Sequence, residues 1–208
     1  IMASNKHIIN IYNSRKHILE ILKTRGFDTT TYNNFDINEI QILSDKNELD
    51  MLVKNDNDKK IYEKYYVNKV IKTQNIYSIV DDLFHLENIL TKNDDLILII
   101  KDEPNDTLQT NVKDIWMSDS IYVSLINIKR LQFNILEHNL VPKHESLSLD
   151  EIKEFKKNFN ILNNDQIPDI SFFSPISIVM GFRPDDIIKI TRKSPTSINS
   201  YFYRICKF

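Results

Sequence analysis

The chain has 208 residues, of which 41% are hydrophobic and 27% are charged, a balance that excludes disorder over the whole chain because enough apolar surface can be buried. The length fits one large domain or two small ones. Lys and Arg number 27 and Asp and Glu 29, so the formal net charge of −2 excludes a chain-wide positive field, and any binding of nucleic acid must come from a local patch.

Several residue types are too scarce for common functional sites. The single cysteine, Cys206, excludes an internal disulfide and a cysteine-based zinc site. Gly26 and Gly181 are the only glycines, which excludes a Gly-rich phosphate loop. The longest apolar run, residues 96–100, is far shorter than the roughly 20 residues of a membrane helix, and the start lacks a signal-peptide pattern. We expect an intracellular protein with no cofactor, no metal and no membrane partner.

The first part of the chain begins with helical patterns. Residues 6–24 carry apolar side chains at helical spacing, and Gly26 follows as a natural stop, which predicts a long first helix. Asp36 and Glu39 form a capping box, which predicts that a shorter second helix begins there. Ile1 precedes Met2, and we expect Met2 to be the natural first residue.

A β-hairpin is predicted next. Residues 49–54 and 61–67 are rich in β-forming side chains. The Asn and Asp residues at 55–58 can adopt the left-handed turn conformation.

Helices and buried strands then alternate. A helical pattern over residues 76–90 is followed by continuous apolar runs at 96–100 and 121–126. Such strands predict a sheet covered on both faces. We therefore expect residues 1–133 to form an α/β domain with a mixed sheet.

The composition of the sequence changes in residues 134–208, where prolines are frequent. Ser148 and Glu151 form a capping box before a helix of about ten residues. Two β runs, at 187–192 and 201–206, finish the chain. This order predicts a second, small α+β domain.

The clearest electrostatic feature is a cationic patch at the C-terminal end. No acidic residue follows Ile187, and the segment contains Lys189, Arg192, Lys193, Arg204 and Lys207. The hydroxyls of Ser194 and Thr196 lie among these cations, and guanidinium and hydroxyl groups together suit anionic oxygens. From the residues alone, a solvated strand face, a protein interface and a nucleic-acid site all stay open.

Two groups of residues are candidates for metal chemistry. His138 and His144 flank Pro142, but proline holds the chain extended and points ligands apart, so histidines hydrogen-bonded to the backbone are the expected outcome. In the first domain, Asp50 followed by Asp58 or Glu63 matches weakly the pattern by which restriction-type nucleases hold a divalent ion. A metal-dependent nuclease is therefore the enzymatic alternative.

Ordered motifs from residue 135 to the end resemble subunit 5 of the eukaryotic DNA-directed RNA polymerases and its archaeal counterpart. Glu137-His138-Asn139-Leu140-Val141-Pro142-Lys143-His144 nearly matches the family signature. The further matches are Ile167-Pro168-x-Ile170, Ser174-Pro175, Met180-Gly181, Ile187-Ile188-Lys189-Ile190-x-Arg192-x-Ser194-x-Thr196 and Tyr203-Arg204-Ile205-Cys206. Arg15-Lys16 and Arg25-Gly26-Phe27 match more faintly near the start. Asp185 and Ile198 stand where the family has glycine, and Ser200 stands where it has tyrosine.

The resemblance implies a non-catalytic polymerase subunit. It implies an N-terminal jaw domain near downstream DNA inside the complex, and a C-terminal assembly domain docked on the largest subunit beside other polymerase subunits. The implied partner-binding residues are Lys189, Arg192, Lys193, Ser194, Thr196 and Arg204. The implied structural residues are Gly26, His138, Pro142, His144, Pro168, Pro175, Gly181 and Tyr203. The departures from the family pattern and the richness in Ile and Asn suggest a polymerase encoded by a large DNA virus. Such a subunit is expected in the virion and host cytoplasm, whereas a cellular subunit would be nuclear.

Overall fold

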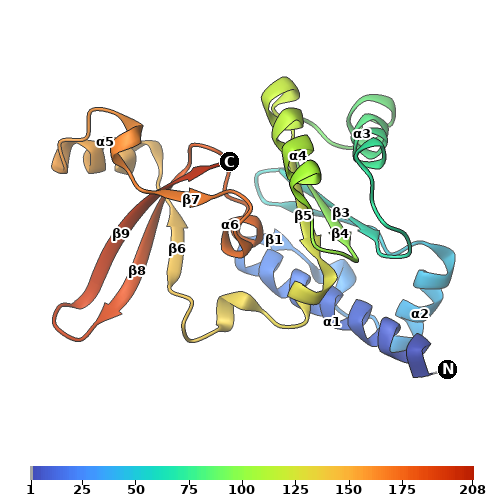
Figure 1. Ribbon diagram of the computed structural model, residues 1–208. Helices are drawn as coiled ribbons and strands as arrows, with labels where there is room; N and C mark the ends of the chain where they lie inside the picture. Colours follow the sequence, from blue (N-terminus) through green and yellow to red (C-terminus); the bar gives the residue numbers. More distant parts are fainter. Residues whose placement is uncertain (1) are drawn as a thin grey trace. The chain divides into compact units, whose positions relative to one another are not determined.

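The computed structural model describes residues 2–208, so the expectation about Ile1 lies outside the described residues. The chain forms two compact units, of which the first ends at Asn134 and the second begins at Ile135 (Figure 1). Among the described residues, no helix combines the length and the hydrophobicity that a membrane span requires.

The first unit opens with the two predicted helices. Helix α1 (Met2–Thr24) buries Ile11, Ile18 and Leu22, and the chain leaves it through Gly26 at φ +84°. After the short elements β1 (Phe27–Asp28) and η1 (Thr30–Tyr32), helix α2 (Ile37–Lys46) begins at the predicted cap. There the Glu39 carboxylate accepts a hydrogen bond of 2.8 Å from the backbone N–H of Asp36.

A five-stranded mixed sheet forms the centre of this unit, as predicted. Its strands are β1, β2 (Met51–Asn55), β3 (Lys60–Tyr66), β4 (Asp95–Ile100) and β5 (Tyr122–Asn127), in that spatial order. The first two pairings are antiparallel and the last two parallel. The β2–β3 turn contains Asp58 at φ +61°, which confirms that an Asp takes the left-handed turn position.

Helices cover both faces of the sheet, which explains why β4 and β5 are buried along their whole length. Figure 1 shows α1 and α2 on one side, and α3 (Thr73–Asp81) and α4 (Asp106–Asp119) on the other. The helix expected over residues 76–90 is shorter, because α3 continues only through the π-helical segment η2 (Asp82–Leu86), and Asn88 then takes a left-handed conformation. Short helical turns η3 (Ile128–Leu131) and η4 (Ile135–Glu137) follow β5.

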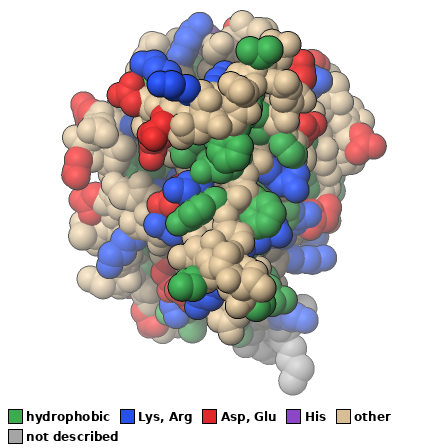
Figure 2. All heavy atoms as spheres, turned by 90° about the vertical axis from the view of Figure 1, so that its left-hand side faces the viewer, with side chains coloured by type: hydrophobic (Ala, Val, Ile, Leu, Met, Phe, Trp, Pro, Cys, Tyr) green, Lys and Arg blue, Asp and Glu red, His purple; other side chains and the backbone are tan. Residues whose placement is uncertain are grey.

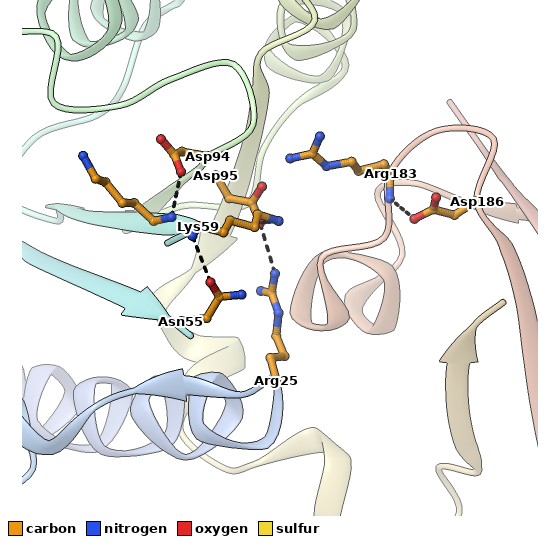
Figure 3. A network of polar contacts seen from close by, with 8 residues as sticks. Arg25, Asn55, Lys59, Asp94, Asp95, Arg183 and Asp186 are labelled. Atoms are coloured by element: carbon orange, nitrogen blue, oxygen red, sulfur yellow. Dashed lines mark hydrogen bonds and ion pairs between the residues drawn. The ribbon is translucent and has the colours of Figure 1, made fainter. Parts of the chain in front are cut away.

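Buried ion pairs fix the start of β4 to the neighbouring hairpin (Figure 3). The fully buried carboxylate of Asp95 lies 3.1 Å from the guanidinium of Arg25 and 2.8 Å from the ammonium of Lys59. Asp94 accepts a hydrogen bond of 2.7 Å from the backbone N–H of Lys60. These contacts join α1, the β2–β3 turn and β4.

The second unit has the predicted α+β character. Its sheet has the order β6 (Lys143–Ser146), β8 (Ile187–Ser194), β9 (Ile198–Lys207) and β7 (Asp169–Ser171). Helix α5 (Leu149–Asn158) begins at the predicted capping box, where Glu151 and Ser148 hydrogen-bond each other. The segment η5 (Asn164–Gln166) and helix α6 (Pro175–Met180) complete the unit. Its core includes Phe155, Ile167, Ile187 and Ile205.

Candidate interaction surface

The predicted cationic patch lies on the β8–β9 hairpin, which extends past its neighbouring strands (Figure 1). Strand β6 pairs with β8 only up to Thr191, and β7 pairs with β9 only at Ile205, Cys206 and Lys207. The pairs Arg192–Ser200, Lys193–Asn199 and Ser194–Ile198 therefore form a two-stranded arm.

The register divides the patch between the two faces of the hairpin. Side chains alternate along a strand, and directly opposed residues share a face. Arg192, Phe202 and Arg204 therefore lie on one side, here called the arginine face. Lys189, Lys193, Tyr201 and Tyr203 lie on the other side, here called the tyrosine face. The residues predicted to form one patch thus belong to two surfaces.

Each face combines a cation with an aromatic ring. On the arginine face, the Arg192 guanidinium carbon lies 4.8 Å from the centroid of the Phe202 ring. On the tyrosine face, the Lys189 ammonium lies 4.5 Å from the centroid of the Tyr201 ring. Such cation–π contacts position long side chains without neutralising them. Each of these two cations is therefore positioned by an aromatic ring.

The charges of the hairpin have few internal partners. Within the described residues, Lys189, Arg192, Lys193 and Arg204 form no ion pair with a carboxylate. Arg204 instead donates a hydrogen bond of 2.9 Å to the backbone carbonyl of Asp169. Figure 2, which shows the left-hand side of Figure 1, has hydrophobic side chains in the middle of the view and Lys and Arg side chains beside them.

The two hydroxyl residues of the predicted patch, Ser194 and Thr196, hydrogen-bond each other within the β8–β9 turn. The Ser194 and Thr196 hydroxyl oxygens lie 3.2 Å apart, and the Thr196 backbone N–H donates to the Ser194 hydroxyl oxygen over 3.4 Å. Ile198, directly after the turn, has φ +59° and an exposed side chain. A β-branched residue in this region is strained, which is a physical reason to expect glycine at this position, as the resemblance implies.

The two glycines end helices in the left-handed conformation. Gly26 follows α1 at φ +84°, and Gly181 ends α6 at φ +70°, with its N–H directed to the carbonyl of Ile178. Asp185, for which the resemblance also implies glycine, has φ +70°, and Asp tolerates this conformation better than Ile does.

The histidines of the signature hydrogen-bond the backbone. His144 Nδ1 donates to the carbonyl oxygen of Pro142 over 2.7 Å, because a carbonyl can only accept. Burial lowers the pKa of His144, and the positive charge of Arg192 lowers it further. His138 Nδ1 accepts a hydrogen bond from the N–H of Leu140 over 3.2 Å.

The remaining residues of the predicted structural set make local contacts within the second unit. The Pro168 carbonyl accepts a hydrogen bond of 2.9 Å from the N–H of Ile205. Pro175 occupies the first turn of α6, after the N-cap Ser174. The Tyr203 ring packs 4.2 Å from the Phe155 ring, centroid to centroid, and thereby joins β9 to α5.

The carboxylates of the nuclease alternative do not converge. Asp50 precedes β2 and Asp58 lies in the turn after it, so the five residues of β2 separate them by roughly 17 Å. The Asp50 carboxylate instead accepts hydrogen bonds from Tyr62, Lys64 and the backbone of Tyr65.

Glu63 also lies apart from Asp50. It is fully buried, and because Tyr62 and Lys64 point to the opposite face of β3, it lies on the other side of the sheet from the Asp50 contacts. Within residues 2–208, no group of three or more His, Cys, Asp or Glu side chains is arranged to hold a metal ion. The hypothesis of a metal-dependent nuclease is not supported.

The sequence interpretation missed the apolar part of the hairpin. Ile198, Tyr201 and Phe202 are exposed to 83%, 54% and 44%. The cluster of aromatic residues at 201–203, after the cations at 189, 192 and 193, is the signal that could have revealed it. The second unit is thus a small α+β domain with an extended hairpin that carries exposed cationic and aromatic side chains.

Comparisons with known proteins define the family of this domain. Residues 133–206 match the family described as RNA polymerase Rpb5, C-terminal domain. The DNA-directed RNA polymerase subunit Rpo5 of Archaeoglobus fulgidus is 45% identical over 75 residues, which are 36% of this chain and 97% of that protein. The Rpo5 subunit of Thermococcus kodakarensis is 42% identical over 74 residues, which are 36% of this chain and 89% of that protein. The Rpo5 subunit of Sulfolobus acidocaldarius is 44% identical over 73 residues, which are 35% of this chain and 86% of that protein.

The chain therefore belongs to the Rpb5/Rpo5 family of RNA polymerase subunits. The matched residues coincide closely with the second compact unit, which begins at Ile135. The first unit lies outside them.

Proposed function

We propose that this protein is a non-catalytic subunit of a multisubunit DNA-directed RNA polymerase, whose active site lies in other subunits. The second unit is the assembly domain and docks on the largest subunit, next to other polymerase subunits. The observation that carries the proposal is the match of residues 133–206 to a family whose archaeal members are named as polymerase subunits.

The surface of the second unit supports docking on a protein. Its exposed hairpin joins aromatic rings to cations without carboxylate partners, and interfaces are enriched in aromatic residues and Arg. The net charge of −2 is a poor basis for binding DNA by the free chain. We therefore propose that the first unit serves as a jaw near downstream DNA only inside the assembled polymerase.

Copurification tests the proposed function. The tagged chain, expressed in its native source, should recover the largest subunit and the other polymerase subunits in fixed ratio. Recovery of the chain alone under conditions that keep the polymerase intact would refute the proposal.

Charge reversal tests the docking surface. Changing Arg192 and Arg204 together to Glu should release the chain from the polymerase, because attraction becomes repulsion. The matched control changes the exposed Lys69 and Lys92 of the first unit to Glu, which alters the net charge equally without touching the second unit, and should leave assembly intact. Circular dichroism should show both variants folded. Equal assembly of the two variants would refute this docking surface.

We also propose that the polymerase is encoded by a large DNA virus, with the protein in the virion and host cytoplasm. The richness in Ile and Asn and the replacement of two family glycines by Asp185 and Ile198 support this proposal. Mass spectrometry of purified virions should detect the protein together with the other polymerase subunits. Its detection only in nuclei of uninfected cells would refute the viral assignment.

A further inference from the structure

One edge of β9 is open for most of its length. In the sheet order β6, β8, β9, β7, strand β7 covers that edge only at residues 205–207. Residues 198–204 continue beyond β7 as part of the extended hairpin. An open edge presents backbone N–H and C=O groups that can pair with another strand.

The backbone hydrogen bonds at the end of β9 define which residues face outward at this edge. The N–H of Ile205 donates to Pro168 on the β7 side, whereas the N–H of Cys206 donates to Asp186 on the β8 side. Because these directions alternate along an antiparallel strand, the N–H and C=O groups of Tyr201 and Tyr203 also face away from β8. No protein group in the described residues 2–208 hydrogen-bonds them.

The open edge borders an apolar groove. The groove has a volume of about 420 Å³, and its lining includes Phe159, Ile161, Ile167, Tyr201 and Tyr203. Phe159 has 61% of its surface exposed, so an apolar side chain entering the groove would cover it. Apolar side chains of a strand paired with β9 would fit this groove.

The cations near the edge favour acidic side chains at those positions of a paired strand that face away from the groove. Arg192 and Arg204 lie on the arginine face, which is the face opposite to Tyr201 and Tyr203. Residues of a paired strand alternate between the two faces. A strand with apolar residues toward the groove therefore directs every second side chain toward the arginines, where an acidic residue fits.

We propose that the edge of β9 at Tyr201 and Tyr203 binds an extended acidic segment of the partner polymerase subunit, which adds to the sheet as a further strand. The segment alternates apolar residues, which enter the groove, with acidic residues, which face Arg192 and Arg204. This inference rests on the proposed function and deepens it, because it specifies the backbone groups that the partner uses.

Hydrogen exchange in the assembled polymerase tests the inference directly. The amides of Tyr201 and Tyr203 should exchange much more slowly in the complex than in the free chain, because strand pairing protects them. If the chain assembles but these amides exchange equally fast in both states, the inference is wrong and the proposed function stands. If the chain does not assemble, the proposed function fails and this inference with it. Protection that appears in the free chain as its concentration rises would assign the edge to a second copy and overturn the inference.

Proline variants separate the backbone contribution from that of the side chain. Tyr201→Pro and Tyr201→Thr both remove the ring, but only proline removes the outward N–H. We expect Tyr201→Pro to weaken binding to the polymerase about tenfold relative to Tyr201→Thr. Equal binding of the two variants would overturn the inference.

A third variant controls for folding. Ser200→Pro removes an N–H that faces β8 and should lower the melting temperature, whereas Tyr201→Pro should melt like Tyr201→Thr. If Tyr201→Pro melts as low as Ser200→Pro, the assigned direction of the edge is wrong and the inference fails.

Discussion

The guanidinium of Arg25 lies 3.1 Å from the carboxylate of Asp95, and this ion pair is almost completely shielded from water. Asp95 is also 2.8 Å from the Lys59 ammonium, so the first residue of β4 contacts both the residue that follows α1 and the β2–β3 turn (Figure 3). Removing one partner of a buried pair leaves an uncompensated charge. The stability of the first unit therefore depends on Asp95.

Asp95→Asn should lower the free energy of unfolding of the first unit by about 3 kcal/mol, because Arg25 stays buried without its counter-charge. Urea unfolding monitored by circular dichroism measures the change. The control is Glu103→Gln, which removes a surface pair with Arg130 and should cost less than about 1 kcal/mol. Similar losses for the two variants would contradict the structural role of Asp95.

Ile198→Gly should stabilise the hairpin by about 1 kcal/mol, because Ile198 is strained at φ +59° and its exposed side chain contributes little burial. Ser200→Gly, at an ordinary strand position, should instead destabilise it by about 0.5–1 kcal/mol. Thermal unfolding of both variants gives the comparison. A lower melting temperature for Ile198→Gly would show that the strain is absent.

Glu63 should make the stability of the first unit depend on pH. Burial raises the pKa of Glu63 from 4.5 to about 8, although Arg15 and Arg25 act in the opposite direction, and neither carboxylate oxygen has a hydrogen-bond partner in the described residues. Between these two pH values the unfolded chain has lost the proton that the folded chain keeps. Stability should therefore fall as pH rises from about 4.5 to 8, by at most about 1.4 kcal/mol per pH unit.

The variant Glu63→Gln isolates this effect. It cannot ionise, so it should be more stable than the parent chain at pH 7 by roughly 3 kcal/mol and equally stable near pH 4. Urea unfolding across this pH range tests the prediction. A parallel decrease in both proteins would assign the pH dependence to other groups.

The thiol of Cys206 should be unreactive in the folded protein. The residue is fully buried, and burial raises the pKa of Cys206 to about 12, so little thiolate forms at neutral pH. Its reaction with a disulfide reagent should require unfolding by denaturant. A Ser197→Cys variant supplies an exposed thiol in the turn and should react at once. Rapid reaction of Cys206 in native buffer would contradict its position in the core.

Much of the fold follows from local patterns. The capping boxes at Asp36 and Ser148 begin α2 and α5, and the apolar runs form β4 and β5. These elements were predictable because their determinants lie within a few residues of one another. Helix α6 and the short strands β6 and β7 were not predicted, because a few residues carry too little periodicity and depend on their neighbours in space.

The cationic character of the last residues and the Asp in the left-handed turn position could be predicted from the residues alone, because both depend on residue type and order. The opposite orientations of Arg192 and Lys193, the separation of Asp50 from Asp58 and the burial of Glu63 became visible only in the folded chain. Strand register and burial arise from pairing between distant segments. A shift of register by one residue would turn every side chain to the other face.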